Sequence, residues 1–139
     1  MNRSLGLAIL MLTLAAAGCG SDNTSTTPST TTPTAGTDTF TATLAPGGTA
    51  IHSFTASTTG TVSVTLTTTN PPATPLGLGI GIPGGNIGAC DLTKTIQAVP
   101  GATAQLTATV EGGSYCAGAF DIGTVGRNGV LVTISVAHP

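Results

Sequence analysis

Apolar and polar residues alternate along most of the chain from residue 38 onward. The alternation is clearest in residues 40–44, 52–56, 62–66, 106–110 and 130–136, where the residues between the apolar positions are mostly threonine and serine. A repeat of two residues places one side of an extended strand against a core and the other side in water. The pattern therefore predicts a series of half-buried β-strands.

Residues 76–82 carry a different version of this repeat, in which large apolar residues alternate with glycine. Glycine weakens a strand but allows another part of the chain to approach its backbone closely. We therefore expect a core strand whose glycine side lies beneath a loop or a neighbouring segment.

Glycine and proline separate these segments at short intervals. Turn signals of this kind occur at residues 46–48, 70–72, 83–85 and 128–129. Further strands are expected at residues 95–98 and 114–122, and no stretch has a convincing helical repeat. About eight short strands joined by such turns are typical of an all-β sandwich or barrel. We predict an antiparallel, two-sheet, jelly-roll-like sandwich over residues 38–139.

The N-terminal residues have the features of a secretory signal. Arg3 supplies a short positive region, and residues 5–17 are almost entirely apolar. This apolar stretch is shorter than the roughly 20 residues that a membrane-spanning helix needs, so it favours a cleaved signal. Residues 16–19, Ala-Ala-Gly-Cys, resemble the bacterial lipobox. That resemblance implies a lipoprotein signal peptide at residues 1–18 and an acylated Cys19.

Acylation of Cys19 predicts a membrane anchor, because each buried CH₂ group of an acyl chain contributes about 0.8 kcal/mol. Gly20, rather than aspartate, follows the cysteine. Under the lipoprotein sorting rule this favours the outer membrane over the inner membrane. The alternative is an ordinary signal peptide that is cut near Ala17 and leaves Cys19 unmodified.

Residues 19–37 form a low-complexity segment of threonine, serine and proline without a large apolar side chain. Such a segment cannot bury enough surface to offset its conformational entropy. We expect a disordered tether between the lipid anchor and the domain.

Charged residues make up only 6% of the chain. Once Arg3 leaves with the signal, two strong bases stand against five acids, a formal charge of −3 with neutral histidines. A nucleic-acid partner is therefore not expected, because such proteins need a basic surface to contact phosphates. The expected partners are the membrane and an envelope protein or polysaccharide.

Three segments together resemble the bacterial pre-peptidase C-terminal domain. They are residues 47–56, 60–66 and 113–123. The resemblance covers about residues 38–137 and implies a β-sandwich of the kind that is appended to exported proteins. Some relatives bind collagen, polysaccharide or calcium. This chain departs from them in its scarcity of aromatic residues and of acids near the start of the domain, so the resemblance supports the fold more than a binding function.

Catalytic residues are not expected. His52 and Ser53 are adjacent, but neighbours in a regular strand point to opposite sides, so they cannot form the nucleophile and base of a triad. His52 shares a side with Phe54 and is expected to be packed or at the rim of the core. His138 precedes the last residue, Pro139, and is expected to be exposed.

Cofactor and metal sites are not expected either. The residues 79–84 match Gly-x-Gly-x-x-Gly, but a turn follows them where a dinucleotide fingerprint requires a helix. The histidines and acids lack the spacing of metal ligands. Asp91 and Asp121 each adjoin a strand region that contains a cysteine, which leaves a weak cation site between them as one reading. The other reading is that Asp121 caps the turn that follows it.

The cysteine count predicts one disulfide. If lipid blocks Cys19, then Cys90 and Cys116 remain, and two cysteines in an oxidising compartment allow a single pairing. Two buried free thiols are the alternative.

These features favour a non-catalytic, lipid-anchored module of the bacterial cell envelope that acts in interaction or structure. A carbohydrate- or matrix-binding module is a narrower alternative and needs an exposed aromatic platform, for which Tyr115 is the one candidate. A small hydrolase that depends on His52 is the third alternative.

Overall fold

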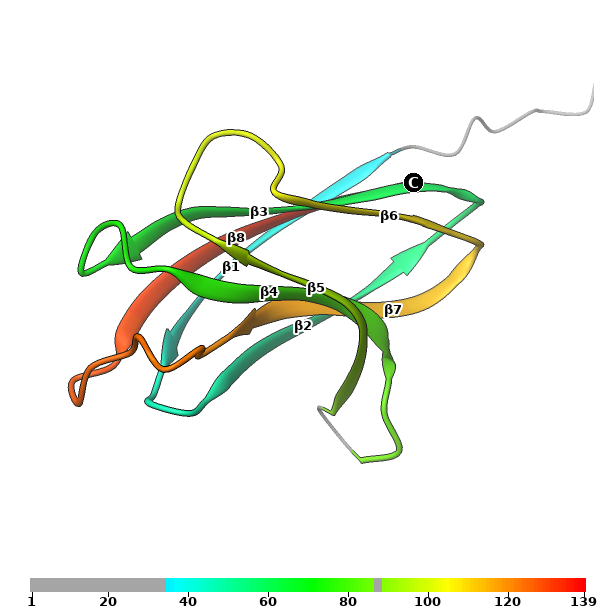
Figure 1. Ribbon diagram of the computed structural model, residues 1–139. Helices are drawn as coiled ribbons and strands as arrows, with labels where there is room; N and C mark the ends of the chain where they lie inside the picture. Colours follow the sequence, from blue (N-terminus) through cyan, green and yellow to red (C-terminus); the bar gives the residue numbers. More distant parts are fainter. Residues whose placement is uncertain (1–34, 87–88) are drawn as a thin grey trace, which may run out of the picture. The chain divides into compact units, whose positions relative to one another are not determined.

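Two antiparallel four-stranded sheets pack face to face in the computed structural model (Figure 1), which describes residues 35–86 and 89–139. The predicted β-sandwich is therefore confirmed. The strands are β1 (Gly36–Leu44), β2 (Thr49–Ala56), β3 (Gly60–Asn70), β4 (Leu76–Pro83), β5 (Cys90–Ala98), β6 (Leu106–Val110), β7 (Gly113–Phe120) and β8 (Val130–His138).

The chain changes sheet at almost every connection. One sheet has the strand order β1-β8-β3-β6 and the other has the order β2-β7-β4-β5, so only β4 and β5 are consecutive strands of the same sheet. The edge strands β1 and β2 belong to different sheets and lie close to each other along one side of the sandwich. This seam brings together side chains that are far apart in the sequence.

The core lies between the sheets and is built by the predicted alternation. Its largest fully buried side chains include Leu44, Leu66, Leu76, Leu78, Ile134, Val62, Val64, Val130, Val132 and Val136. These are mostly β-branched or leucine side chains, which suit a pleated surface that is buried on one side. The threonines and serines between them point away from the core.

Strand β4 has the covered glycine side that its sequence predicts. Leu76, Leu78 and Ile80 enter the core, whereas a Cβ atom on Gly77 would overlap the Phe120 ring and one on Gly79 would lie 2.6 Å from Leu92 Cδ1. The neighbouring strands β7 and β5 supply these two side chains. Side chains of the paired strands, and not a loop, therefore cover Gly77 and Gly79.

Several boundaries differ from the prediction. The strand expected at residues 114–122 is β7, which ends at Phe120 because Asp121 accepts hydrogen bonds from the turn that follows. Strand β1 begins at Gly36, because β8 is long enough to pair His138 with Gly36 and Ala137 with Thr37. The last two residues of the predicted tether thus belong to the sheet. The short strand expected at residues 95–98 is the end of a longer strand, β5, whose pairing with β4 starts at Cys90.

The predicted signal peptide, Cys19 and the tether up to residue 34 lie outside the described residues. Within the part of the chain that the structure describes, no helix has the length and apolar character needed to cross a membrane.

Candidate functional site

Three ionisable side chains, one each from β1, β2 and β8, meet at the seam between β1 and β2. Asp38 of β1 points inward, and its Oδ2 atom lies 3.1 Å from Nε2 of His52 on β2, at hydrogen-bonding distance. The same oxygen lies 3.5 Å from Nε2 of His138 on β8. One carboxylate therefore stands beside two imidazole rings from two different sheets.

Aromatic rings hold both imidazoles in place. The Phe40 ring stacks on His52 with 5.0 Å between centroids, and the Phe54 ring stacks on His138 at 5.2 Å. Tyr115 in turn stacks on Phe54, with 6.0 Å between the ring centroids. Stacked pairs of this kind add to the stability that burial of their area already gives.

The position of His138 corrects the prediction of an exposed side chain. Its side chain is only 14% exposed, and both ring nitrogens are buried without a hydrogen bond among the described residues. The ring is buried because His138 pairs with Gly36 of β1. The imidazole lies over Gly36, where a Cβ atom would come within 2.6 Å of the ring, so glycine provides the space that the ring occupies.

The cluster lacks the arrangement that a nucleophilic site requires. His52 faces Asp38 and the seam, whereas Ser53 is exposed on the other side of the strand, as the alternation predicts. No pocket is found over residues 35–86 and 89–139. In the same ranges no three histidine, cysteine or acidic side chains are grouped as metal ligands.

Tyr115 lies against the core and not on a platform. It is partly buried and packs beside Phe54 and the core cluster. A flat aromatic surface for a sugar ring is therefore not built from the one residue that the sequence offered for it.

Asp91 and Asp121 do not approach each other, so the reading of a shared cation site is wrong. Asp91 pairs with Ile82 at the end of β4. Asp121 follows Phe120, which pairs with Gly77 near the start of β4. The cysteine of β7 is near the middle of its strand, so its bond to β5 does not bring Asp121 toward Asp91.

Asp121 instead organises the turn that follows it, as the other reading predicts. Its Oδ1 atom accepts hydrogen bonds from the backbone N–H groups of Gly123, Thr124 and Val125, at 2.8, 2.9 and 3.0 Å. Its Oδ2 atom accepts a fourth bond, 2.8 Å long, from the N–H group of Gly47 in the β1–β2 turn. The carboxylate thereby joins two turns at one end of the sandwich.

These bonds favour the charged form of the carboxylate. The Gly47 N–H group, followed by that of Val125, holds the pKa of Asp121 below its ordinary value of 3.8, against a smaller opposing effect of desolvation. A lowered pKa in the folded state stabilises the fold at pH values above the unfolded pKa, and this contribution is lost as the pH falls through the folded pKa.

We expect Asp121→Asn to lower the urea midpoint near neutral pH and to weaken the fall in that midpoint as the pH drops below 3.8, the ordinary pKa of this carboxyl group. The amide NH₂ group cannot accept the bond from Gly47, and the side chain no longer titrates. Urea denaturation at a series of pH values measures both effects. Asp91→Asn, which removes an exposed carboxylate, is the matched control; an Asp121→Asn profile that coincides with the control would contradict the assignment.

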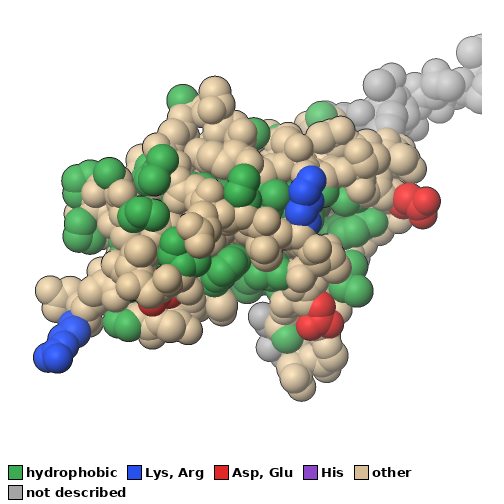
Figure 2. Space-filling model, in the orientation of Figure 1, with side chains coloured by type: hydrophobic (Ala, Val, Ile, Leu, Met, Phe, Trp, Pro, Cys, Tyr) green, Lys and Arg blue, Asp and Glu red, His purple; other side chains and the backbone are tan. Residues whose placement is uncertain are grey.

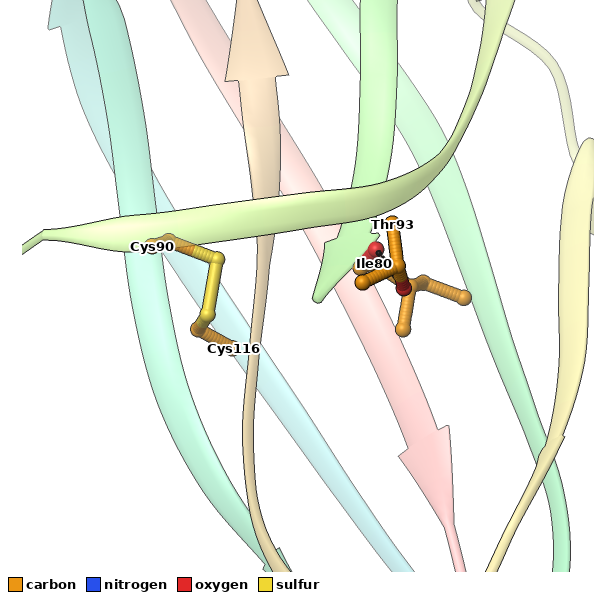
Figure 3. Close-up of a disulfide and its surroundings, with 4 residues drawn as sticks. All are labelled: Ile80, Cys90, Thr93 and Cys116. Atoms are coloured by element: carbon orange, nitrogen blue, oxygen red, sulfur yellow. Dashed lines mark hydrogen bonds between the residues drawn. A yellow bond between two sulfur atoms is a disulfide. The ribbon is translucent and has the colours of Figure 1, made fainter. Parts of the chain in front are cut away.

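The predicted disulfide is present. Cys90 at the start of β5 and Cys116 in β7 are bonded, with Cα atoms 6.0 Å apart (Figure 3), inside the range that a disulfide can bridge. The alternative of two free thiols is therefore wrong. Since β4 lies between β7 and β5 in the sheet, the bond reaches across a strand.

A β-bulge in β5 and a glycine in β4 allow the start of β5 to come close enough to Cys116 for this bond. The pairing of β4 with β5 shifts between Ile80 and Gly81, which leaves Thr93 as the extra residue, and the Thr93 hydroxyl donates to the Ile80 carbonyl oxygen at 3.3 Å. A bulge bends its strand. Beyond it, the backbone of β5 lies directly on Gly81, where a Cβ atom would come within 2.6 Å of the Asp91 carbonyl carbon.

No protein-family model, no curated protein and no solved structure matches this chain.

Proposed function

We propose that this chain is a non-catalytic, lipid-anchored β-sandwich of the bacterial cell envelope that acts as an interaction or structural module. In this proposal residues 1–18 are a lipoprotein signal peptide, Cys19 carries the acyl chains, and the threonine-rich segment is a tether. The outer membrane is the favoured location, since Gly20 follows the cysteine.

The main support for the proposal comes from the three cysteines of the chain. Cys90 and Cys116 are bonded to each other, and the remaining cysteine of the chain is the one at the end of the Ala-Ala-Gly-Cys motif. Disulfides persist in oxidising compartments outside the cytosol. Export and lipid attachment together account for all three residues.

The side chains at the seam support a module without catalysis. Asp38 and His52 are hydrogen-bonded to each other, and the imidazoles of His52 and His138 are each stacked on a phenylalanine ring. This arrangement joins the edges of two sheets. An inward-pointing charge on an edge strand such as β1 also discourages pairing with another chain. The β-sandwich architecture further supports the proposed kinship with the pre-peptidase C-terminal domain.

We expect Cys19→Ser to move the protein from the membrane to the aqueous phase. Two or more acyl chains of many CH₂ groups anchor a protein almost permanently, whereas the substituted chain has no such anchor. The measurement is detergent-phase partitioning after expression in a bacterium that processes lipoproteins, together with intact-mass analysis of the mature protein.

The matched control is the Cys90→Ser/Cys116→Ser double variant, which should enter the detergent phase like the wild type because Cys19 is intact. If the wild-type protein and Cys19→Ser both remain in the aqueous phase, the anchor does not exist and the proposed function fails.

A further inference from the structure

Strand β5 leaves one edge of its sheet open. It is the outer strand of the sheet β2-β7-β4-β5 and pairs with β4 on its inner side (Figure 1). Its residues Thr93–Gln97 are all exposed. The unpaired N–H and C=O groups along such an edge are a template for pairing with another strand.

The other edge strands are more protected. Strands β1 and β2 face each other at the seam, where Asp38 and His52 are hydrogen-bonded. Strand β6 is short, and the carbonyl oxygen of its Thr107 accepts a hydrogen bond of 2.6 Å from Nζ of Lys94 on β5. Of the four edge strands, β5 has the largest share of exposed residues.

The β-bulge places the two charged side chains of β5 on the same side of the sheet. Lys94 pairs with Ile80 of β4, and Asp91 pairs with Ile82. Since residues two apart in β4 point to the same side, their partners do so as well. Residues three apart would point to opposite sides of a regular strand, and the extra residue Thr93 removes this difference. Within the described part of the chain, neither charged side chain has an ion-pair partner.

We propose that β5 pairs with β5 of a second copy of this chain, in an antiparallel arrangement about a two-fold axis. The register sets Asp91 of each copy opposite Lys94 of the other. Opposite charges that face each other across antiparallel strands stabilise the pairing, and a two-fold interface makes each contact twice. The inference goes beyond the proposed function, because it names the partner and does not require an acylated Cys19.

The charge pattern favours a second copy in this one register. A lone lysine on an edge strand discourages pairing, whereas an antiparallel copy offers a carboxylate at the matching position. A parallel copy in register would set like charges opposite each other. Figure 2 shows that charged side chains are few and separate on the face in view, so this complementary pair is distinctive. The ammonium group of Lys94 has three N–H donors and can keep its bond to Thr107 while it contacts the carboxylate.

The test is cross-linking of the full-length protein with a water-soluble carbodiimide, in the cell fraction that carries the protein. The reagent joins a carboxylate and an amine that are in contact, forming an amide while the carbodiimide takes up the water that is lost. Lys94 is the only lysine of the chain. We expect a dimer on a denaturing gel, in which mass analysis finds Asp91 of one chain joined to Lys94 of the other. Two joined copies of the segment that holds both residues can come only from two chains.

Three variants test the register. Asp91→Lys should lower the dimer yield about tenfold, because it places like charges opposite each other at two positions. Asp91→Lys/Lys94→Asp exchanges the two charges and should restore the dimer. The matched control is Glu111→Lys, which makes the same change in charge and adds a second lysine at an exposed position outside β5; it should form the dimer like the wild type. Thermal melting checks that each variant folds.

Absence of a wild-type dimer, a dimer linked through a carboxylate other than Asp91, or an unchanged yield in Asp91→Lys overturns the proposal. A charge-exchanged variant that melts like the wild type but stays monomeric also overturns it. Detergent partitioning of the wild type tests the anchor separately. Failure of the β5 pairing and failure of the lipid-anchored module therefore give different results.

Discussion

Replacing both Cys90 and Cys116 with serine is expected to lower the free energy of unfolding by about 3–4 kcal/mol. The bond closes a loop with a sequence separation of 26 residues, and loop-closure entropy in the unfolded chain gives a stabilisation of about that size. A typical domain is stable by only about 5–15 kcal/mol. For a domain of this size the melting temperature should fall on the order of 20 °C.

The position of the disulfide explains why its loss should lower the free energy of unfolding by this much. Strand β5 is an edge strand, and most of its residues are exposed. Little burial therefore holds its first residues against the sheet, whereas Cys116 is fully buried. The disulfide attaches the exposed start of β5 to a rigid part of β7.

The measurement is urea denaturation followed by circular dichroism, with and without a reducing agent. Reduction should shift the midpoint of the wild type and leave that of the double variant unchanged. Alkylation before reduction should label neither cysteine of the wild-type domain. Equal midpoints for the wild type and the double variant would show that the bond does not contribute to stability.

Much of the fold follows from residue types at short range. The alternation in residues 62–66 and 130–136 is enough to predict which side of each strand is buried, because the side-chain repeat of a strand is two residues. The disulfide follows from counting three cysteines. The role of Asp121 in its own turn also follows from local sequence, since aspartate commonly accepts bonds from the next few N–H groups.

The features that sequence analysis missed depend on pairing between distant segments. Asp121 also binds Gly47, which is 74 residues away. His138 is buried because Gly36 lies opposite it. The residues next to each of them in the sequence give no indication of this contact. The seam cluster depends in the same way on two edge strands from different sheets meeting at Asp38.

Gln105 is a further case. Its side-chain amide accepts from the Leu66 N–H group at 2.8 Å and lies 3.3 Å from the Leu66 carbonyl oxygen, to which it donates. The Gln105 side chain thus makes with Leu66 the pair of hydrogen bonds that the backbone of a strand residue would make, just before β6 begins. A single polar residue beside a glycine- and alanine-rich loop gives no sequence signal for this role, because the partner is in β3.

Gly81→Ala is expected to prevent complete formation of the disulfide and to destabilise the domain by about 1–3 kcal/mol from overpacking alone. An added Cβ atom would lie 2.6 Å from the Asp91 carbonyl carbon and 2.8 Å from the Leu92 Cα atom. These are backbone atoms and cannot rotate away. The start of β5 must move outward instead, and cysteines whose Cα atoms separate beyond about 7 Å cannot be bridged.

Two control variants separate this effect from a general intolerance of alanine. Gly126→Ala places its Cβ atom in open space and should leave both stability and oxidation unchanged. Gly79→Ala meets the Leu92 side chain, which can adopt another rotamer, so it should destabilise the domain but keep the bond. Alkylation and mass analysis should therefore detect free thiols in Gly81→Ala and none in the two controls. A fully oxidised Gly81→Ala protein with the wild-type urea midpoint would mean that β5 does not need the bare backbone of Gly81 to reach Cys116.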